Sequence, residues 1–176
     1  YASYVMYITK GLVKIYLENP NRKITNIQIL KKSDFIGLSS IFGDSINQYS
    51  AIALRDAEVC LIEKDGIKEL LDKNGAFASS VIRRYCENEK ALFEKIKSIS
   101  YKQMNGRLAD ALLYLGSEKF KDENIFNYIN RKDIADFACI SKESTVKLLT
   151  EFRSDGLIEL DGKQVDILKE ETLKSI

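Results

Sequence analysis

The sequence of 176 residues contains no histidine, no tryptophan, a single proline and three cysteines. Without histidine, the chain itself cannot supply a Ser-His-Asp triad, imidazole acid-base catalysis or histidine ligands for zinc and haem. Cys60, Cys86 and Cys139 are too widely separated to form a Cys-x-x-Cys zinc or redox motif. We expect all three to be buried, reduced thiols, and we predict neither a metal site nor a cofactor in this chain.

Long apolar runs and an excess of one charge are also lacking. Lys and Arg number 27 against 26 Asp and Glu, which leaves a net charge of +1. No apolar run could cross a bilayer and the first residues lack the layout of a signal peptide, so we predict a cytoplasmic protein without a membrane partner. Because the chain is nearly neutral, any nucleic-acid function must depend on local arrangement and not on overall charge.

The N-terminal part is rich in β-branched and aromatic residues with turn residues between them, which is typical of antiparallel strands. Lys10-Gly11 and Arg55-Asp56 are interpreted as turns between strands. Alternation in the third strand places Asn26 and Gln28 on the solvent face. We predict a small antiparallel β-domain over residues 1–74, and because it starts in a strand without an initiator Met, we expect further N-terminal strands to be missing. The predicted strands are residues 4–8, 12–17, 23–30, 50–54 and 58–62.

After Asp65 the pattern becomes helical. Asp65 is the predicted N-cap of a short helix that ends near Leu71. From Gly75, apolar residues recur at steps of three, four and seven, which predicts an amphipathic helix of about 24 residues. The apolar stripe could pack on its own domain, but we favour a seam between two copies of the chain, because the β-domain is too small to cover it. Residues 75–101 are therefore assigned as a dimerisation helix, with Val81, Tyr85, Leu92, Ile96 and Ile99 in the contact.

Residues 102–176 have the pattern of a winged helix-turn-helix. Asn130 is a predicted N-cap with Asp133 as the reciprocal acceptor, and Ser141 is predicted to cap a second helix after a tight turn. Asp161-Gly162 between two alternating segments is typical of a type I′ hairpin, which would form the wing. Helix, turn, helix and wing therefore occur in the expected order.

The second helix of a helix-turn-helix enters the major groove by its first residues. Glu143 lies there and could accept a hydrogen bond from cytosine N4, and Lys147, four residues on, could donate to guanine. The alternative is a surface ion pair between the two, which would stabilise the helix by only about 0.3–0.5 kcal/mol. We favour DNA reading. The candidate DNA-binding residues are thus Lys142, Glu143, Ser144 and Lys147 on the outward side of the helix start, with Glu143 and Lys147 as base readers, and Arg131, Lys132 and Ser141 as phosphate contacts.

Several stretches together resemble the CRP/FNR family of bacterial transcription regulators, over essentially the whole chain. Residues 7–11 and 33–37 resemble strand endings of that family's cyclic-nucleotide-binding β-roll. Residues 105–109 resemble the start of its DNA-binding domain, residues 131–149 its helix-turn-helix and residues 155–158 the entry to its wing. The resemblance implies an α+β fold that consists of an antiparallel β-roll, a long dimerisation helix and a C-terminal winged helix-turn-helix.

The resemblance also implies a mechanism and partners. An effector or redox state in the β-roll would reorient the DNA-binding domains about a hinge near residues 100–105, in a homodimer that binds palindromic double-stranded DNA. RNA polymerase and an unknown small-molecule effector are the other expected partners. Lys142 and Lys147 stand where the family usually has Arg, so the base preference is expected to be weaker or different. Nothing in the residues supports the iron-sulfur cluster or haem that other members use.

The β-roll departs from the family's cAMP-binding members. The Glu that holds the ribose is replaced by leucine, the Arg-Ser pair that grips the phosphate by Tyr-Ser, and the polar adenine contacts by Leu-Phe. A buried cyclic phosphate without its cation would lose about 1.5–3 kcal/mol, so we expect no cAMP binding. The pocket either takes a more apolar effector or is filled by its own side chains. Its candidate residues are Gly37, Leu38, Tyr49, Ser50, Leu92 and Phe93.

Two alternatives belong to other functional classes. A ligand-binding signalling module whose winged domain contacts only proteins would show little of the steep salt dependence that DNA binding has. An enzyme is disfavoured, because no carboxylate pair, activated nucleophile or glycine-rich phosphate loop appears in a suitable context. The segment from Tyr101 to Arg153 has nine basic and eight acidic residues, so the DNA hypothesis depends on where the charges lie.

Overall fold

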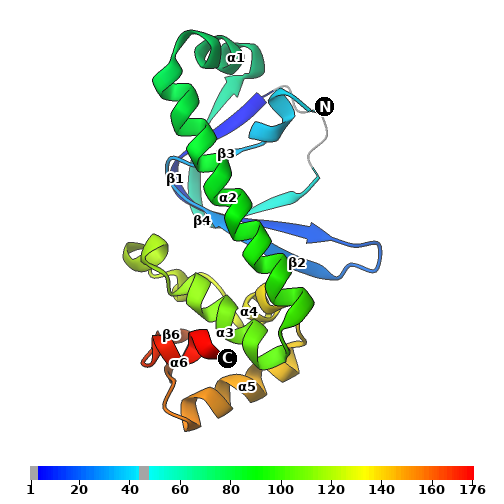
Figure 1. Cartoon of the computed structure of the whole chain (residues 1–176), viewed down its shortest axis with the longest axis vertical. Coiled ribbons are helices and arrows are strands. Elements are labelled where there is room, and N and C mark those ends of the chain that lie inside the picture. The colour runs from blue at the N-terminus through cyan, green and yellow to red at the C-terminus, as the bar shows by residue number, and fades with distance from the viewer. Residues whose placement is uncertain (1–3, 44–47) are drawn as a thin grey trace. The chain divides into compact units, whose positions relative to one another are not determined.

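A computed structural model describes residues 4–43 and 48–176 and shows an α+β protein with an antiparallel sheet, a long helix and a helical C-terminal part (Figure 1). Residues 1–3 and 44–47, which belong to the predicted β-domain, lie outside the described residues. The chain divides into two compact units, Tyr1–Phe93 and Glu94–Ile176. None of the helices that the structure describes combines the length and apolar character needed to cross a membrane.

The first unit is built around β1, which pairs antiparallel with β2, β3 and β4. The short helix η1 lies between β3 and β4 in the chain, and α1 and α2 follow β4. The elements are β1 (Tyr4–Glu18), β2 (Ile24–Leu30), β3 (Phe35–Ile36), the 3-10 helix η1 (Leu38–Ile41), β4 (Ser50–Glu63), α1 (Lys64–Lys73) and most of α2 (Gly75–Tyr101).

The turns predicted at Lys10-Gly11 and Arg55-Asp56 are wrong, because β1 and β4 are each one continuous strand. Gly11 has a φ of +97°, and a Cβ on it would lie 2.5 Å from the Cα of Ala57 on β4. The register of the pair shifts between Lys10 and Leu12. A glycine in this conformation forms a bulge that bends the paired strands without ending them.

The alternation predicted for β2 is interrupted. Asn26, expected on the solvent face, is fully buried, whereas Ile27 is half-buried. Ile15 pairs with Gln28 and Tyr16 pairs with Asn26, so the register passes over Ile27. Such a bulge moves the residues that follow it to the other face of the sheet, which strict alternation in the sequence cannot reveal.

The helix α1 begins before the predicted cap. It starts at Lys64, and Asp65 lies in its first turn instead of capping it. Ile67 on α1 is buried together with Val5 and Ile41, so α1 closes one end of the sheet's core. A second buried cluster lies on the sheet itself and consists of Ile8, Val13, Ile15, Leu30 and Ile36.

A buried ion pair attaches α2 to the sheet. The carboxylate of Asp34, in the turn before β3, belongs to a side chain that is 3% exposed. Its Oδ1 lies 2.6 Å from Nη2 of Arg84 on α2, and its Oδ2 accepts the backbone N–H of Lys31 at 2.8 Å. This turn and the long helix are therefore held together by charge as well as by packing.

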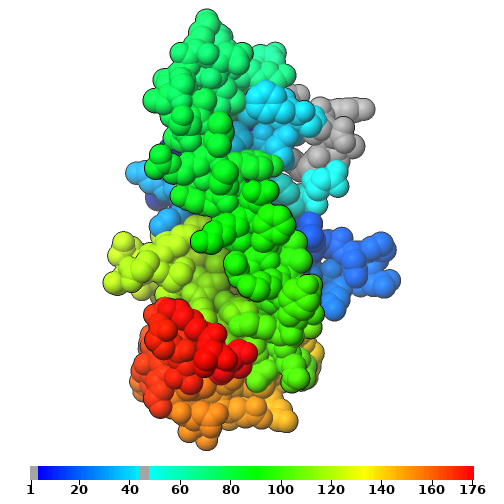
Figure 2. Space-filling model, viewed as in Figure 1, coloured from blue at the N-terminus to red at the C-terminus, as the bar shows by residue number. Residues whose placement is uncertain are grey.

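The predicted apolar stripe of α2 is largely accessible. Tyr85, Leu92 and Ile96 are 55%, 44% and 49% exposed, while Val81 and Ile99 are half-buried. In the view of Figure 2, side chains of α2 lie at the surface along the length of the helix. The chain by itself therefore leaves much of this stripe uncovered.

The expectation that the three cysteines are buried is wrong. Cys60 and Cys86 are exposed and Cys139 is partly exposed. Cys86 lies on α2 outside the predicted apolar stripe, and Cys60 lies on β4, none of whose residues is fully buried. Their exposure depends on which faces of these elements are covered, and the apolar neighbours along the sequence do not show this.

The second unit has a core between its helices and a short hairpin. The predicted inward residues Thr145, Leu149 and Phe152 of α5 are buried, and Leu148 is half-buried. The C-terminal helix α6 and the two 3-10 helices were not predicted. The elements are α3 (Met104–Leu115), η2 (Glu118–Glu123), η3 (Ile125–Asn127), α4 (Arg131–Ala138), α5 (Lys142–Ser154), β5 (Ile158–Asp161), β6 (Gln164–Ile167) and α6 (Glu170–Ser175).

The last turns of α2 are bonded to α3 and α4. Asp110 on α3 accepts hydrogen bonds from Ser98 Oγ at 2.6 Å and from Lys102 Nζ at 2.8 Å. Lys95 Nζ donates to the carbonyl oxygen of Phe137 at 2.6 Å, and burial lowers the pKa of this lysine. These contacts restrain the segment next to the hinge that the family resemblance implies.

Candidate nucleic-acid interface and effector pocket

The capping box predicted at the start of α4 is confirmed. The side-chain oxygen of Asn130 accepts the backbone N–H groups of Lys132 at 2.8 Å and Asp133 at 3.0 Å. In return, Asp133 accepts the backbone N–H of Asn130 at 2.9 Å. These bonds satisfy N–H groups that the helix itself leaves without partners. The first residues of α4 are therefore held in one conformation.

The turn and the second helix follow the predicted pattern. Cys139 ends α4 in the left-handed conformation, with a φ of 55°, which reverses the chain. Ser141 caps α5 by accepting the backbone N–H of Ser144 at 3.0 Å. Thr145 is buried and donates to the carbonyl oxygen of Ser141 at 2.9 Å. The two helices are thus fixed by local hydrogen bonds at the point where the chain turns.

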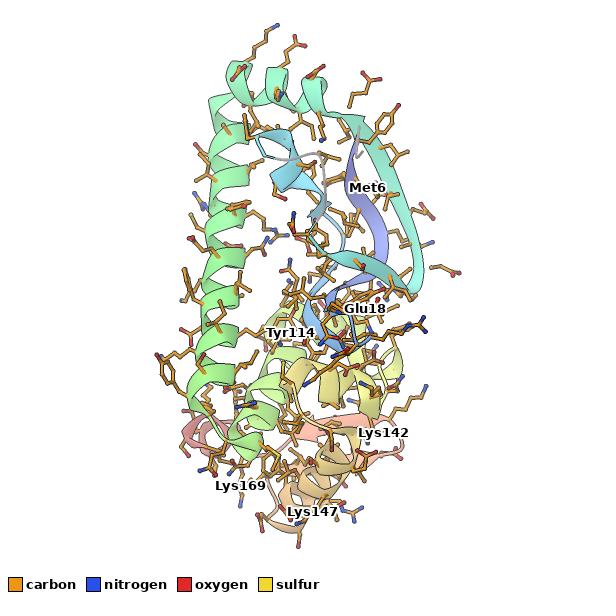
Figure 3. The ribbon with its side chains drawn as sticks, turned by 90° about the vertical axis from the view of Figure 1, so that its right-hand side faces the viewer. Met6, Glu18, Tyr114, Lys142, Lys147 and Lys169 are labelled. Carbon is orange, nitrogen blue, oxygen red and sulfur yellow. The ribbon has the colours of Figure 1, made fainter. Side chains whose placement is uncertain are left out.

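Three of the four predicted DNA-binding side chains at the start of α5 are exposed, whereas Ser144 is half-buried and accepts a hydrogen bond from the Ser141 hydroxyl at 3.1 Å. Lys142 and Lys147 extend from this helix into solvent (Figure 3), and Glu143 is exposed beside them. Hydrogen bonds from its own backbone N–H and from Ser141 hold the pKa of the Glu143 carboxyl below its usual value, so the group is ionised at neutral pH. Lys147 lies 3.8 Å from Glu151, and no ion pair joins it to Glu143 in the described part of the chain.

The three predicted phosphate contacts are all engaged within the protein. Ser141 uses its hydroxyl as the cap of α5. Lys132 forms an ion pair with the buried carboxylate of Asp136 one turn along α4. Arg131 donates from Nη2 to the carbonyl oxygen of Gly162 at 2.8 Å and from Nη1 to that of Lys163 at 3.3 Å. Partial burial lowers the pKa of Arg131.

The turn of the wing differs by one residue from the predicted one. Asp161 pairs with Gln164, so the two turn residues are Gly162 and Lys163 and not Asp161-Gly162. Of these two, Gly162 alone has a positive φ, of 55°. Glycine with positive φ at the first turn position is the pattern of type II′, not of the predicted type I′.

The start of α4, the start of α5 and the wing turn surround one pocket. It contains four cationic side chains and no acidic one, so this part of an almost neutral unit is locally positive. Lys163 was missed by the sequence analysis, although its place next to the glycine of the wing turn was a usable signal. The lining residues are Ile129, Asn130, Arg131, Lys132, Lys142, Gly162 and Lys163.

Among the candidate effector-pocket residues, Tyr49 is bonded to Gly37 and packs on the core of the β-domain. The backbone N–H of Gly37 donates to the Tyr49 hydroxyl at 2.7 Å, and the ring packs on the sheet's core. Burial raises the pKa of this phenol, and Tyr85 on α2 adds to the increase. Leu38 packs against the other core cluster.

The remaining candidates do not join this arrangement. Ser50 is exposed at the start of β4, and Leu92 and Phe93 are 44% and 62% exposed on α2. Within the described residues, no group of three or more Cys, Asp and Glu side chains is placed to hold a metal ion.

Comparison with known families and relatives gives matches to both parts of the chain. Residues 1–74 match the cyclic nucleotide-binding domain and residues 106–176 match the Crp-like helix-turn-helix domain. The chain is 26% identical over 159 residues to the anaerobic regulatory protein of Bacillus subtilis, covering 88% of this chain and 67% of that protein. It is 24% identical over 170 residues to the CRP-like cAMP-activated global transcriptional regulator of Mycobacterium tuberculosis, covering 94% and 76%.

Solved structures share the fold. FixK2 from Bradyrhizobium japonicum superposes with a TM-score of 0.82 at 17% identity, covering 99% of this chain and 87% of that one. A transcriptional regulator of the CRP/FNR family from Thermus thermophilus gives 0.76 at 16% identity, covering 98% and 86%. The chain carries a cyclic nucleotide-binding domain followed by a Crp-like helix-turn-helix domain, and with these two domains and its relatives in sequence it looks like a regulator of the CRP/FNR family.

Proposed function

We propose that this protein is a sequence-specific DNA-binding transcription regulator. The observation that carries the proposal is the surface at the start of α5. Lys142, Glu143 and Lys147 are exposed there, and Lys142 also lines the pocket that contains four cationic side chains. Donors and acceptors on a helix start can read base edges in the major groove, while adjacent cations bind phosphates. RNA polymerase is the further partner that a transcription regulator of this family needs.

The proposal includes a homodimer formed along α2. Residues 75–101 would form the seam, with Val81, Tyr85, Leu92, Ile96 and Ile99 in contact with the second copy. Support comes from the exposure of Tyr85, Leu92 and Ile96, since apolar side chains at helical spacing favour burial in a two-helix seam. Two recognition helices would then bind half-sites about 34–36 Å apart on palindromic DNA.

Selection of binding sites from a random duplex pool, followed by footprinting, tests the function directly. We expect a protected site with two-fold symmetry and an affinity for it that falls steeply with salt, because bound phosphates release counterions. A scrambled duplex of equal length and composition is the control. Enrichment of no sequence, or a footprint without two-fold symmetry, would contradict the proposal. A weak salt dependence would favour the alternative, in which the winged domain contacts only proteins.

We further propose that the β-roll does not bind cAMP. The Tyr49 hydroxyl already accepts the Gly37 N–H, and Leu38 belongs to the packed core. A cyclic phosphate at this place would have to displace the Tyr49 ring and would meet neither the arginine nor the glutamate of cAMP-binding members. Removing a packed aromatic ring and burying an unpaired phosphate are both unfavourable.

Isothermal titration with cAMP tests this proposal. We expect no binding heat at micromolar concentrations of cAMP, and no increase in the temperature of unfolding when the nucleotide is added. The same sample must unfold cooperatively, so that an absent signal does not reflect an unfolded β-roll. Submicromolar affinity for cAMP would overturn this part of the proposal.

A further inference from the structure

Arg131 has an unusual set of partners for a residue expected to contact DNA. It is the first residue of α4, and its guanidinium donates to both carbonyl oxygens of the wing turn, Gly162 at 2.8 Å and Lys163 at 3.3 Å. These bonds join residues 31 and 32 positions apart in the chain. Arg131 therefore connects the helix-turn-helix to the wing.

The two ends of this connection are held in different ways. The capping box of Asn130 and Asp133 fixes the backbone at the start of α4. The strands of the wing pack into the core of the unit through Ile158 and Val165, which are 1% and 2% exposed, whereas the turn residues Gly162 and Lys163 are exposed. A planar guanidinium can bind two neighbouring acceptors at once, which a lysine ammonium does less well. The arrangement suits a residue that holds the wing turn in place.

The residue that this turn carries is Lys163. It lines the same pocket as Lys132 and Lys142, which belong to the helix-turn-helix. The lining of this pocket includes no acidic side chain, although Lys132 pairs with Asp136, which is not part of the lining. A lysine has three hydrogen-bond donors and no acceptor, so cations gathered in this way suit a phosphate of the DNA backbone. Lys163 reaches this position only while the wing turn lies against α4.

We propose that Arg131 is a positioning residue that holds the wing turn against the helix-turn-helix, and that Lys163 on this turn contacts a DNA phosphate. Arg131 then acts on DNA affinity through Lys163 and not through a phosphate of its own. This inference rests on the proposed DNA-binding function, and it differs from the prediction that Arg131 is itself a phosphate contact.

The salt dependence of DNA binding separates the two roles. Each lost phosphate contact lowers the slope of log affinity against log salt by about 0.9 for duplex DNA. We expect a decrease of about 0.9 per subunit for Lys163→Ala, for Arg131→Ala and also for the double variant, because all three lose one and the same contact. Arg131→Lys should behave like Arg131→Ala, since it keeps the charge but not the two bonds to the turn.

Lys132→Gln is the matched control, because it removes a cation from the same pocket without touching the wing and keeps a hydrogen-bond donor for the buried Asp136 carboxylate. Combined with Lys163→Ala it should lower the slope by about 1.8 per subunit. If Arg131→Ala and Lys163→Ala also add to about 1.8, or if Arg131→Lys retains the wild-type slope, Arg131 contacts its own phosphate and the inference is overturned.

Hydrogen exchange in the free protein gives a second readout. Amides of residues 162–164 should exchange faster in Arg131→Ala and Arg131→Lys than in wild type, and at the wild-type rate in Lys163→Ala. Unchanged exchange in both Arg131 variants would overturn the positioning role, whatever the DNA results. Wild-type protein that selects no DNA sequence would overturn the proposed function and the Lys163 contact, while the exchange data would still decide on the link between Arg131 and the wing.

Discussion

Replacement of Arg84 by alanine is expected to lower the free energy of unfolding of the first unit by about 3 kcal/mol. The change removes the cation that lies 2.6 Å from the Asp34 carboxylate, which is 3% exposed. The carboxylate would stay in its buried site with the Lys31 N–H as its remaining described hydrogen-bond donor. Because Arg84 itself is 38% exposed, water can reach part of the site, and we place the effect at the low end of the range for a broken buried pair.

Urea denaturation followed by far-ultraviolet circular dichroism measures this effect, with the transitions of the two units fitted separately. Arg83→Ala is the matched control, since Arg83 is the exposed neighbour on the same helix, and it should change stability by less than about 0.5 kcal/mol. Adding Asp34→Asn to Arg84→Ala should recover part of the loss, because a neutral amide is less costly to bury than an unpaired carboxylate. Equal stabilities for Arg84→Ala and Arg83→Ala would show that the ion pair contributes nothing.

Replacement of Glu143 by alanine is expected to reduce the preference for the selected base pair at one operator position by about 10-fold to 100-fold. The carboxylate is exposed at the start of α5 and can accept a hydrogen bond from cytosine N4 in the major groove. Binding to unrelated duplexes should stay equal or become slightly tighter, because a negative charge near the phosphates is removed.

Competition binding with operators that differ at single positions measures this preference. Glu118→Ala is the control, because it removes the same charge from η2 of the same unit, and it should leave the preference at every position unchanged. The preference at the Glu143 position should also be constant between about pH 6 and pH 8. A carboxyl whose pKa is lowered loses its charge only as pH falls through that lowered pKa, below the usual range near 4.3. An unaltered preference in Glu143→Ala would exclude base reading by this residue.

The parts of the fold that were predictable from the sequence are those made by neighbouring residues. The Asn130 and Asp133 capping box joins residues three positions apart, and the same holds for Ser141 and Ser144. The apolar steps of α2 indicated its position, and the structure places the helix at Gly75–Tyr101. These features follow from helix geometry, in which residues three and four apart are always neighbours.

The errors arose where a contact between distant residues decides the local structure. Gly11 was read as a turn, but it lies against Ala57 of the paired strand, so it makes a bulge. The exposure of Cys60 and Cys86 depends on which faces of β4 and α2 are covered. A turn glycine and a bulge glycine look alike in the sequence, and so do a buried and an exposed cysteine with apolar neighbours. Only strand pairing and packing in the folded chain distinguish them.

The sequence by itself determined the class of protein, through the order of β-domain, long helix, helix-turn-helix and wing. It also placed Lys142, Glu143 and Lys147 at the start of the second helix, which makes DNA reading the favoured function. The tertiary structure alone decided that Tyr49 binds the Gly37 N–H, that Arg84 neutralises Asp34 and that Arg131 donates to the carbonyl oxygens of the wing turn. The physical reason is that a guanidinium or hydroxyl can bind any acceptor within reach. Which acceptor is within reach is set by how the folded chain brings distant residues together.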